Sequence, residues 1–309
     1  MTGRMRLAAL TVVLLALAPA VAEARGGPCL PGGDGPRCTF WTAKVVHVHD
    51  GDTLEVEVHG TTQRIRVTGI QAMEQTVYSS FATRRRGECH AVAATNRFEQ
   101  LVRRSRGVVR LAAQDPRSRS GKRWRRSVAV RDRGSGGWRD VGEILVGEGH
   151  ALWLTNPVEW AWNARYAAAA ERAAAQRLRL WHPDACGAGP SADADLNVRV
   201  NWDADGVDVE NPNGEWIRVV NRSGRDVPLG GWWVRDSALR RFRFPAGTTA
   251  PAGGSVTVRV GRGAQRGSVF HWGLGEPAFE NVTGDGHHVG DGAYLFDPDG
   301  DLRGFSMYH

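Results

Sequence analysis

The sequence predicts a mainly β protein of two domains, a five-stranded barrel with about three helices followed by a β-sandwich. Three patterns support this fold class. Apolar and polar residues alternate over residues 40–67, as in half-buried strands. An alanine-rich segment before Trp181 has the composition of a long helix. After residue 195 only short alternating runs remain, separated by Gly, Pro and Asn. The 309 residues are enough for two domains with separate cores.

Residues 1–24 have the features of a secretory signal peptide. Arg4 and Arg6 precede an apolar run, and small residues follow it. The run is too short to anchor the chain across a bilayer. We therefore expect a secreted, extracellular protein without a membrane span after cleavage, with an uncleaved anchor as the alternative.

Four cysteines follow this segment, namely Cys29, Cys38, Cys89 and Cys186. An even number in an exported chain predicts two disulfides, and the absence of a CxxC pair argues against zinc. Four cysteines allow three pairings. The short Pro- and Gly-rich loop favours Cys29 with Cys38, which leaves Cys89 with Cys186.

The first domain is expected over residues 39–187, after an irregular segment at 25–38. The predicted elements are three antiparallel strands within 40–67, a helix at 89–104, strands at 107–114 and 125–132, a short helix at 140–153, and a helix capped by Asn156 and Pro157 that runs to Trp181. A basic loop, residues 115–124, separates the fourth and fifth strands. This order closes naturally into an OB-fold, whose strand face often binds nucleic acid.

Charge is unevenly distributed along the chain. Residues 191–309 carry 12 Arg against 16 acidic residues, a net charge of −4, so residues 1–190 carry +11. Such a basic field favours a polyanionic partner such as DNA or RNA. General arginine richness is the alternative, but it does not explain why the excess lies in one half.

Acidic and basic residues gather around the first three predicted strands. Asp50 and Asp52 lie in the first tight turn, Arg66 lies on the third strand, and Glu74 follows it. The ends of strands converge in a small barrel. Clustered carboxylates suit a hard cation such as calcium, and an adjacent arginine suits a phosphate.

Four segments carry a family resemblance over residues 40–187. They are "VHDGDTLEVEVHGTTQRIRVTGIQAMEQ", "RWRRSVAV", "VGEILVGEGHALW" and "AAAQRLRLW". In this order they resemble the staphylococcal nuclease (thermonuclease) family. The resemblance implies calcium-dependent hydrolysis of DNA and RNA phosphodiesters that leaves 3'-phosphate ends.

The resemblance also implies roles for individual residues. Asp52 would ligate Ca2+, supported by Asp50 through water and by the Ala72 carbonyl. Arg66 would hold the scissile phosphate, and Glu74 would orient or deprotonate the attacking water. The second catalytic arginine would be Arg126, with Arg125 the next candidate.

One position departs from the family pattern. Gln71 stands where the family has a second anionic ligand, and Met73 stands where it has proline. A neutral carboxamide lowers the charge beside a divalent cation, so weaker calcium binding, or use of Mg2+ or Mn2+, is expected.

The basic loop supplies the expected nucleic-acid contacts, namely Lys122, Arg123, Trp124 and Arg125. The tryptophan ring offers a surface on which a base can stack.

The second domain is expected over residues 195–309, after a linker at 188–194. The segments "NPNGEWIRVVNRSGRDVPLGGWWVRD" and "GDGAYLFDPDGDLRGFSMY" resemble the lamin-tail domain, which implies an immunoglobulin-like sandwich used for interaction or anchoring. The loop "DADGVD" (203–208) lacks the glutamate of a calcium-binding loop and is interpreted as a hydrated acidic turn.

The sequence therefore predicts a secreted, metal-dependent nuclease whose lamin-tail domain contacts a cell surface or a protein partner. Two alternatives stay open. One is a catalytically impaired protein that binds nucleic acid, because of Gln71. The other is an extracellular adhesion protein in which the barrel is only a scaffold.

Overall fold

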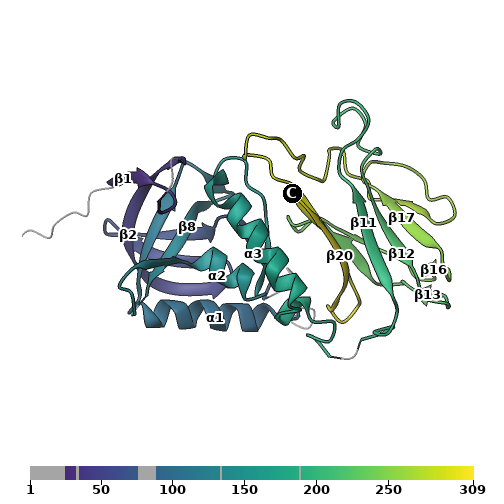
Figure 1. Cartoon of the computed structure of the whole chain (residues 1–309), viewed down its shortest axis with the longest axis horizontal. Coiled ribbons are helices and arrows are strands. Elements are labelled where there is room, and N and C mark those ends of the chain that lie inside the picture. Colours follow the sequence, from purple (N-terminus) through teal and green to yellow (C-terminus); the bar gives the residue numbers. More distant parts are fainter. Residues whose placement is uncertain (1–24, 33–34, 76–87, 133, 188) are drawn as a thin grey trace, which may run out of the picture.

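The computed structural model of the chain describes residues 25–32, 35–75, 88–132, 134–187 and 189–309. The predicted signal peptide at 1–24 lies outside these ranges. Figure 1 shows a first part of strands and helices beside a C-terminal part built of strands. Across the described ranges, no helix combines the length and apolarity needed to span a membrane.

The first part is organised around one sheet. Its main strands are β1 (Arg25–Pro28), β2 (Arg37–Asp50), β3 (Thr53–Val58), β4 (Thr61–Val67), β6 (Val108–Ala113) and β8 (Arg123–Arg131). The pairings run from β2 through β3, β4, β8 and β6, and β6 pairs again with β2. The expected strands at 40–67, 107–114 and 125–132 are confirmed, whereas β1 occupies a segment expected to be irregular.

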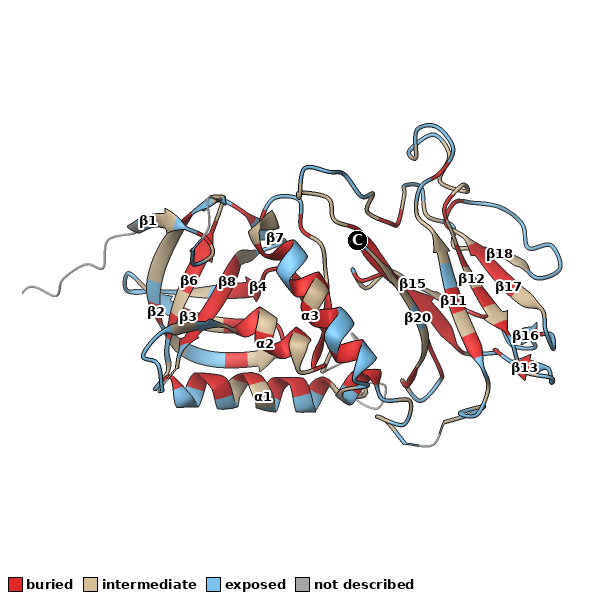
Figure 2. Ribbon diagram, viewed as in Figure 1, coloured by how far each residue is buried: buried red, intermediate tan, exposed pale blue. Residues whose placement is uncertain are grey.

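The described α-helices of this part are α1 (Ala91–Arg104), α2 (Val141–Gly147) and α3 (Asn163–Ala175). α1 and α2 pack against the sheet, and α3 packs against α2 and β10. α1 buries the apolar face that its sequence spacing predicts, with Phe98 fully enclosed. Figure 2 marks the buried residues along α1, which packs against β2 and β8. α3 lies on the side that faces the C-terminal part (Figure 1).

Three helix boundaries differ from the sequence expectation. The long helix, expected to run to Trp181, ends at Ala175 and is followed by a 3-10 helix at Arg179–Trp181. Asn156 does act as a cap, because its side chain accepts hydrogen bonds from Val158 and Glu159 at 3.0 Å. However, the turn that it caps leads into a 3-10 helix (Trp160–Trp162), and the α-helix begins at Asn163. The expected short helix ends early, because Ala151–Trp153 forms strand β10, which pairs with β5 (Ile70–Ala72).

The C-terminal part contains two four-stranded sheets. One comprises β11 (Leu196–Asn201), β12 (Trp216–Asn221), β17 (Ser255–Arg259) and β18 (Val269–His271). The other comprises β15 (Arg241–Arg243), β14 (Trp233–Arg235), β19 (Asp291–Phe296) and β20 (Leu302–Tyr308). Apolar side chains of both sheets form one buried cluster that includes Ile217 and Leu295. The arrangement fits the expected β-sandwich.

The two parts are joined covalently and by packing. The disulfides are Cys29–Cys38 and Cys89–Cys186, so the expected pairing is confirmed. The buried cluster of the first part extends into the C-terminal part through Trp233, Tyr294, Phe296 and Leu302. The separate cores expected for two independent domains are therefore partly fused.

We expect Asp291 to make stability depend on pH. Burial and the neighbouring Asp236 raise its pKa to about 7, against about 4 in an unfolded chain. The folded state then binds the proton more tightly, so the free energy of unfolding falls as pH rises from about 4 to about 7. Asp291→Asn should remove this loss, on the order of 1 kcal/mol per pH unit. Urea unfolding across pH tests this, with the exposed Asp299→Asn as control; an unchanged pH profile for Asp291→Asn would contradict it.

Candidate functional site

The turn between β2 and β3 is packed tightly against its neighbours. Asp50 Oδ1 accepts a hydrogen bond from the Asp52 backbone N–H at 3.0 Å. A Cβ on Gly51 would lie 2.6 Å from the Cβ of Ala72 and 2.7 Å from that of Ala94. Only glycine therefore lets the turn approach β5 and α1 this closely. The turn brings Asp52 to β5.

Asp52 is the most enclosed carboxylate of the cluster. One oxygen accepts from Thr53 Oγ1 at 2.9 Å and from Arg66 Nη1 at 2.5 Å. The other accepts from Ala72 N at 2.8 Å and from Gln71 Nε2 at 3.5 Å. Burial raises the pKa of Asp52 to about 7, and the positive charge of Arg66 opposes that rise.

Arg66 and Gln71 form the centre of the cluster. Arg66 is 7% exposed and donates to Asp52, to the Gln71 Oε1 and to the Ile70 carbonyl. Because Oε1 accepts from Arg66, the Gln71 Nε2 group faces the carboxylates. It donates to Glu74 Oε1 at 3.4 Å and to the Ala72 carbonyl at 3.1 Å, besides Asp52. The carboxamide therefore links the arginine to two carboxylates.

Glu74 stands at the edge of this cluster. Burial, followed by the negative charge of Asp50, raises its pKa. Its backbone N–H donates to Glu88 Oε2 at 2.8 Å. Glu74 lines a cavity of about 870 Å3, together with Asp50, Thr53, Lys122 and Arg123 among others. A carboxyl group with a raised pKa is suited to act as a general base near neutral pH.

Strand β8 places its arginines on two opposite faces. Arg123 Nη1 donates to Thr53 Oγ1 at 3.2 Å. Arg125 is the register partner of Arg66 in the parallel β4–β8 pair and lines a cavity of about 500 Å3 with it. Burial, followed by the charge of Arg66, lowers the pKa of Arg125. Arg123 and Arg125 thus lie on the face of β8 that is turned toward the cluster.

Arg126 is not brought to the cluster. Its guanidinium donates to the carbonyls of Pro116 and Arg125, both at 2.6 Å, and lies 4.8 Å from the ring of Trp41. Burial lowers its pKa to about 10. Of the two arginines expected from the sequence, Arg125 therefore lies beside the cluster and Arg126 does not. Alternation along a strand, combined with the parallel pairing to Arg66, is the pattern that distinguishes the two.

The residues of β8 that are expected to contact nucleic acid also lie on two different faces of this strand. Lys122 is exposed in the turn between β7 (Arg119–Ser120) and β8. Trp124 donates through Nε1 to Gln63 Oε1 at 2.8 Å, and the Arg119 guanidinium lies 3.4 Å from its ring. Trp124 instead lines a separate cavity of about 270 Å3, together with Trp41 and Arg126. It is not on the side of the cluster with Arg123 and Arg125.

The residues expected to hold calcium meet, but their arrangement does not fit the ion. Both oxygens of Asp52 already accept two hydrogen bonds each, which fills the acceptor capacity of a carboxylate. Gln71 presents a nitrogen donor to the carboxylates, and the Ala72 carbonyl accepts from it. Within the described residues, no group of three or more His, Cys, Asp or Glu side chains could hold a metal ion.

We expect Gln71→Asp to create a cation site here. The substitution removes the Nε2 donor and adds a second anionic ligand beside Asp52, so Ca2+ should bind at least about tenfold more tightly than to the wild type. Isothermal titration calorimetry measures this affinity. The matched control is Gln176→Asp, at the end of α3. Equal calcium affinity in the Gln71→Asp variant and the wild type would contradict the prediction.

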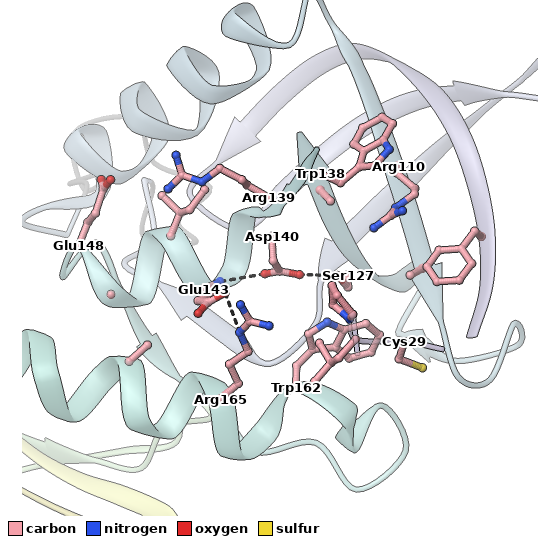
Figure 3. A pocket seen from close by; sticks show the side chains of 18 of the residues that line it. Cys29, Arg110, Ser127, Trp138, Arg139, Asp140, Glu143, Glu148, Trp162 and Arg165 are labelled. Atoms are coloured by element: carbon pink, nitrogen blue, oxygen red, sulfur yellow. Dashed lines mark hydrogen bonds and ion pairs between the residues drawn. The ribbon is translucent and has the colours of Figure 1, made fainter. Parts of the chain in front are cut away.

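Another cavity, of about 460 Å3, lies between β9 (Trp138–Asp140), α2 and α3 (Figure 3). At its base, Asp140 caps α2 and accepts from Glu143 N, Ser127 Oγ and Tyr166 Oη. These bonds join β9, β8 and α3. The buried Asp140 therefore has a structural role in positioning α2, and sequence reasoning did not identify it.

Comparison with known proteins identifies the C-terminal part. The family profile described as Lamin Tail Domain matches residues 193–307, so the expected lamin-tail domain is confirmed with nearly the expected bounds. No curated protein matches the chain. Lamin-tail domains suggest a role in protein interaction.

Proposed function

We propose that residues 39–187 form a nuclease-like OB-fold domain that acts on the phosphodiester backbone of DNA or RNA. One observation carries the proposal: segments separated by up to 22 residues bring Asp52, Arg66, Gln71 and Glu74 into one bonded cluster. The circuit of strand pairings that returns from β6 to β2 supports the barrel. Export is proposed from the N-terminal sequence, and two disulfides agree with it.

The chain's own groups supply the chemistry of this proposal. Glu74, with its raised pKa, accepts a proton from the attacking water as the water oxygen bonds to phosphorus. The P–O5' bond breaks, and the leaving 5'-oxygen takes a proton from solvent water. Negative charge then develops on the nonbridging phosphate oxygens, and fixed guanidinium groups stabilise this charge more in the transition state than in the substrate. In this proposal Arg123 and Arg125 take this role, because they lie beside Thr53 and Arg66. Arg66 keeps donors beyond those used by Asp52, Gln71 and Ile70, because a guanidinium has five N–H groups.

Cleavage of plasmid DNA and of a labelled RNA strand by the purified full chain tests this function. The assay is run with Ca2+, Mg2+, Mn2+ or a chelator, and Glu74→Gln is the matched inactive variant. Cleavage by the wild type and its loss in Glu74→Gln support the proposal. Intact substrates under all four conditions would rule out hydrolysis.

Binding without cleavage is the second candidate, and the position of the Gln71 carboxamide favours it. That group ties Arg66, Asp52 and Glu74 together in one hydrogen-bonded network rather than leaving an open catalytic centre. This candidate predicts salt-sensitive binding of single-stranded DNA that persists with a chelator, since phosphate contacts release counterions. The lamin-tail domain would then hold the protein on a partner protein or cell surface.

The two faces of β8 allow a direct test of where the phosphate backbone binds. Arg125→Ala should weaken binding of single-stranded DNA and reduce the dependence of log affinity on log salt by about one phosphate contact. Arg126→Ala is the matched control, because its guanidinium is engaged by backbone carbonyls on the other face. Fluorescence anisotropy across salt concentrations measures both. A larger effect of Arg126→Ala would place the nucleic acid on the opposite face.

A further inference from the structure

Glu215 is a fully buried acid with half of its carboxylate unbonded. It directly precedes β12 and has no exposed surface. Its Oε2 accepts from the backbone N–H groups of Ala278 at 2.6 Å and Phe279 at 3.3 Å. Its Oε1 is buried without a hydrogen-bond partner. Leaving a buried carboxylate oxygen unpaired is strongly unfavourable, so a bound ligand would stabilise this oxygen.

A second unpaired oxygen lies on the same segment as the amides that hold Glu215. Asn281 follows Phe279 by two residues, and its buried Oδ1 also lacks a partner. The nitrogen of this carboxamide donates to Asp208 Oδ2 at 2.8 Å, which fixes its orientation. Asp208 is thereby bonded to the segment 278–281, whose Ala278 and Phe279 amides bind Glu215. Hydrogen bonds thus tie two carboxylates from other positions in the chain to this one segment.

The arginine whose charge acts on Glu215 is already engaged by other groups. Arg240 attracts Glu215, but its guanidinium donates to Asp236 and to the carbonyls of Pro277 and Ala278. No hydrogen bond joins it to the free oxygen of Glu215, which is unpartnered in the described structure. The negative charge of Asp208 and Glu215 therefore lacks a bonded cation on this side.

We propose that Asp208, Glu215 and Asn281 form a binding site for a hard divalent cation of the calcium type. The candidate ligands are two carboxylates and a carboxamide oxygen, the ligand set that Ca2+ prefers. Asn281 Oδ1 accepts no hydrogen bond from the described residues, in contrast to Gln71 Oε1, which accepts from Arg66. Asp208 and Asn281 are partly exposed, so water has access to complete the coordination. The site is independent of the Asp52 cluster, which belongs to the other part of the chain.

The cation would connect two loops at one end of the sandwich. Asp208 lies in the loop between β11 and β12, where its Oδ1 also accepts from Ala204 N at 3.2 Å. Asn281 lies between β18 and β19, on the segment already bound by Glu215. Binding to the folded state alone would stabilise it in proportion to the logarithm of cation concentration.

Thermal unfolding and calorimetry of the full chain, with Ca2+ or with a chelator, test the site. We expect Tm to rise with Ca2+ concentration and one bound ion to depend on this cluster. Glu215→Gln should lower the affinity about tenfold or more. Asp208→Asn provides the same test at a partly exposed position if Glu215→Gln fails to fold. Asp205→Asn, an exposed acid in the same loop, is the matched control and should keep the response.

Two outcomes overturn the proposal. The first is a wild-type Tm that does not respond to Ca2+ while Glu215→Gln is as stable as the wild type, which would mean that a proton occupies the cluster. The second is a calcium response that survives both Glu215→Gln and Asp208→Asn. If Asp52→Asn abolishes that response instead, the ion binds at the Asp52 cluster, so the two sites are distinguished.

Discussion

Replacing Arg66 by alanine should lower the free energy of unfolding by about 3–5 kcal/mol, because it leaves a buried carboxylate without its positive partner. Arg66 and Asp52 are 7% and 2% exposed and are joined at 2.5 Å. Gln71 would lose the donor to its Oε1 in the same step. Urea unfolding monitored by tryptophan fluorescence measures the change. A turnover defect in Arg66→Ala would then include loss of structure.

Arg64→Ala is the matched control for this variant, because Arg64 lies on the same strand but is exposed. Its ion pair with Glu55, at 3.0 Å, is on the surface, and such pairs contribute about 0–1 kcal/mol. A second control is Asp52→Asn combined with Arg66→Ala, which removes both charges and should recover part of the loss. Similar destabilisation by Arg64→Ala and Arg66→Ala would contradict the buried ion pair.

Removing the Cys89–Cys186 disulfide should have the other large effect. This bond closes a loop with a sequence separation of 97 residues, whereas Cys29–Cys38 spans 9. Loop-closure entropy then predicts losses of about 4.7 and about 2.7 kcal/mol, respectively. Urea unfolding of the Cys89→Ser/Cys186→Ser and Cys29→Ser/Cys38→Ser variants compares the two. A larger loss of unfolding free energy on removing Cys29–Cys38 would show that chain entropy does not decide which disulfide stabilises more.

Local sequence patterns predicted most strands and helices of the first part, because the apolar residues of these elements repeat with the period of a strand or a helix. Alternation located β2, β3 and β4, and the helical spacing of Ala94, Phe98 and Leu101 located α1. Short elements were not predicted. β5 and β10 each contain three residues, and they form only because the chain brings residues 70–72 and 151–153 together. Their residues carry no repeat long enough to recognise.

The sequence predicted which residues gather in the candidate site, but it did not predict the contacts among them. Motif order placed Asp52, Arg66 and Glu74 correctly in one cluster, yet it chose Arg126 over Arg125. That choice depends on which of the two arginines lies on the same face of the sheet as Arg66, and the Arg66–Arg125 register decides this. The role of Gln71 was expected to be that of a poor metal ligand. Gln71 instead accepts a hydrogen bond from Arg66 through its Oε1. No local sequence pattern shows that Arg66 needs this acceptor.

The position of Glu88 determines how this protein can be dissected experimentally. Its backbone N–H donates to the Glu74 carbonyl at 2.8 Å, its Oε2 accepts from the Glu74 N–H, and its Oε1 pairs with Arg241 on β15. Leu239, from the same hairpin, forms part of the wall beside Arg66. A truncated chain that ends before β11 would lose both the Glu88–Arg241 ion pair and the Leu239 side of the cavity. Assays on the isolated N-terminal fragment would therefore report on a Glu74 whose surroundings differ from those in the full chain.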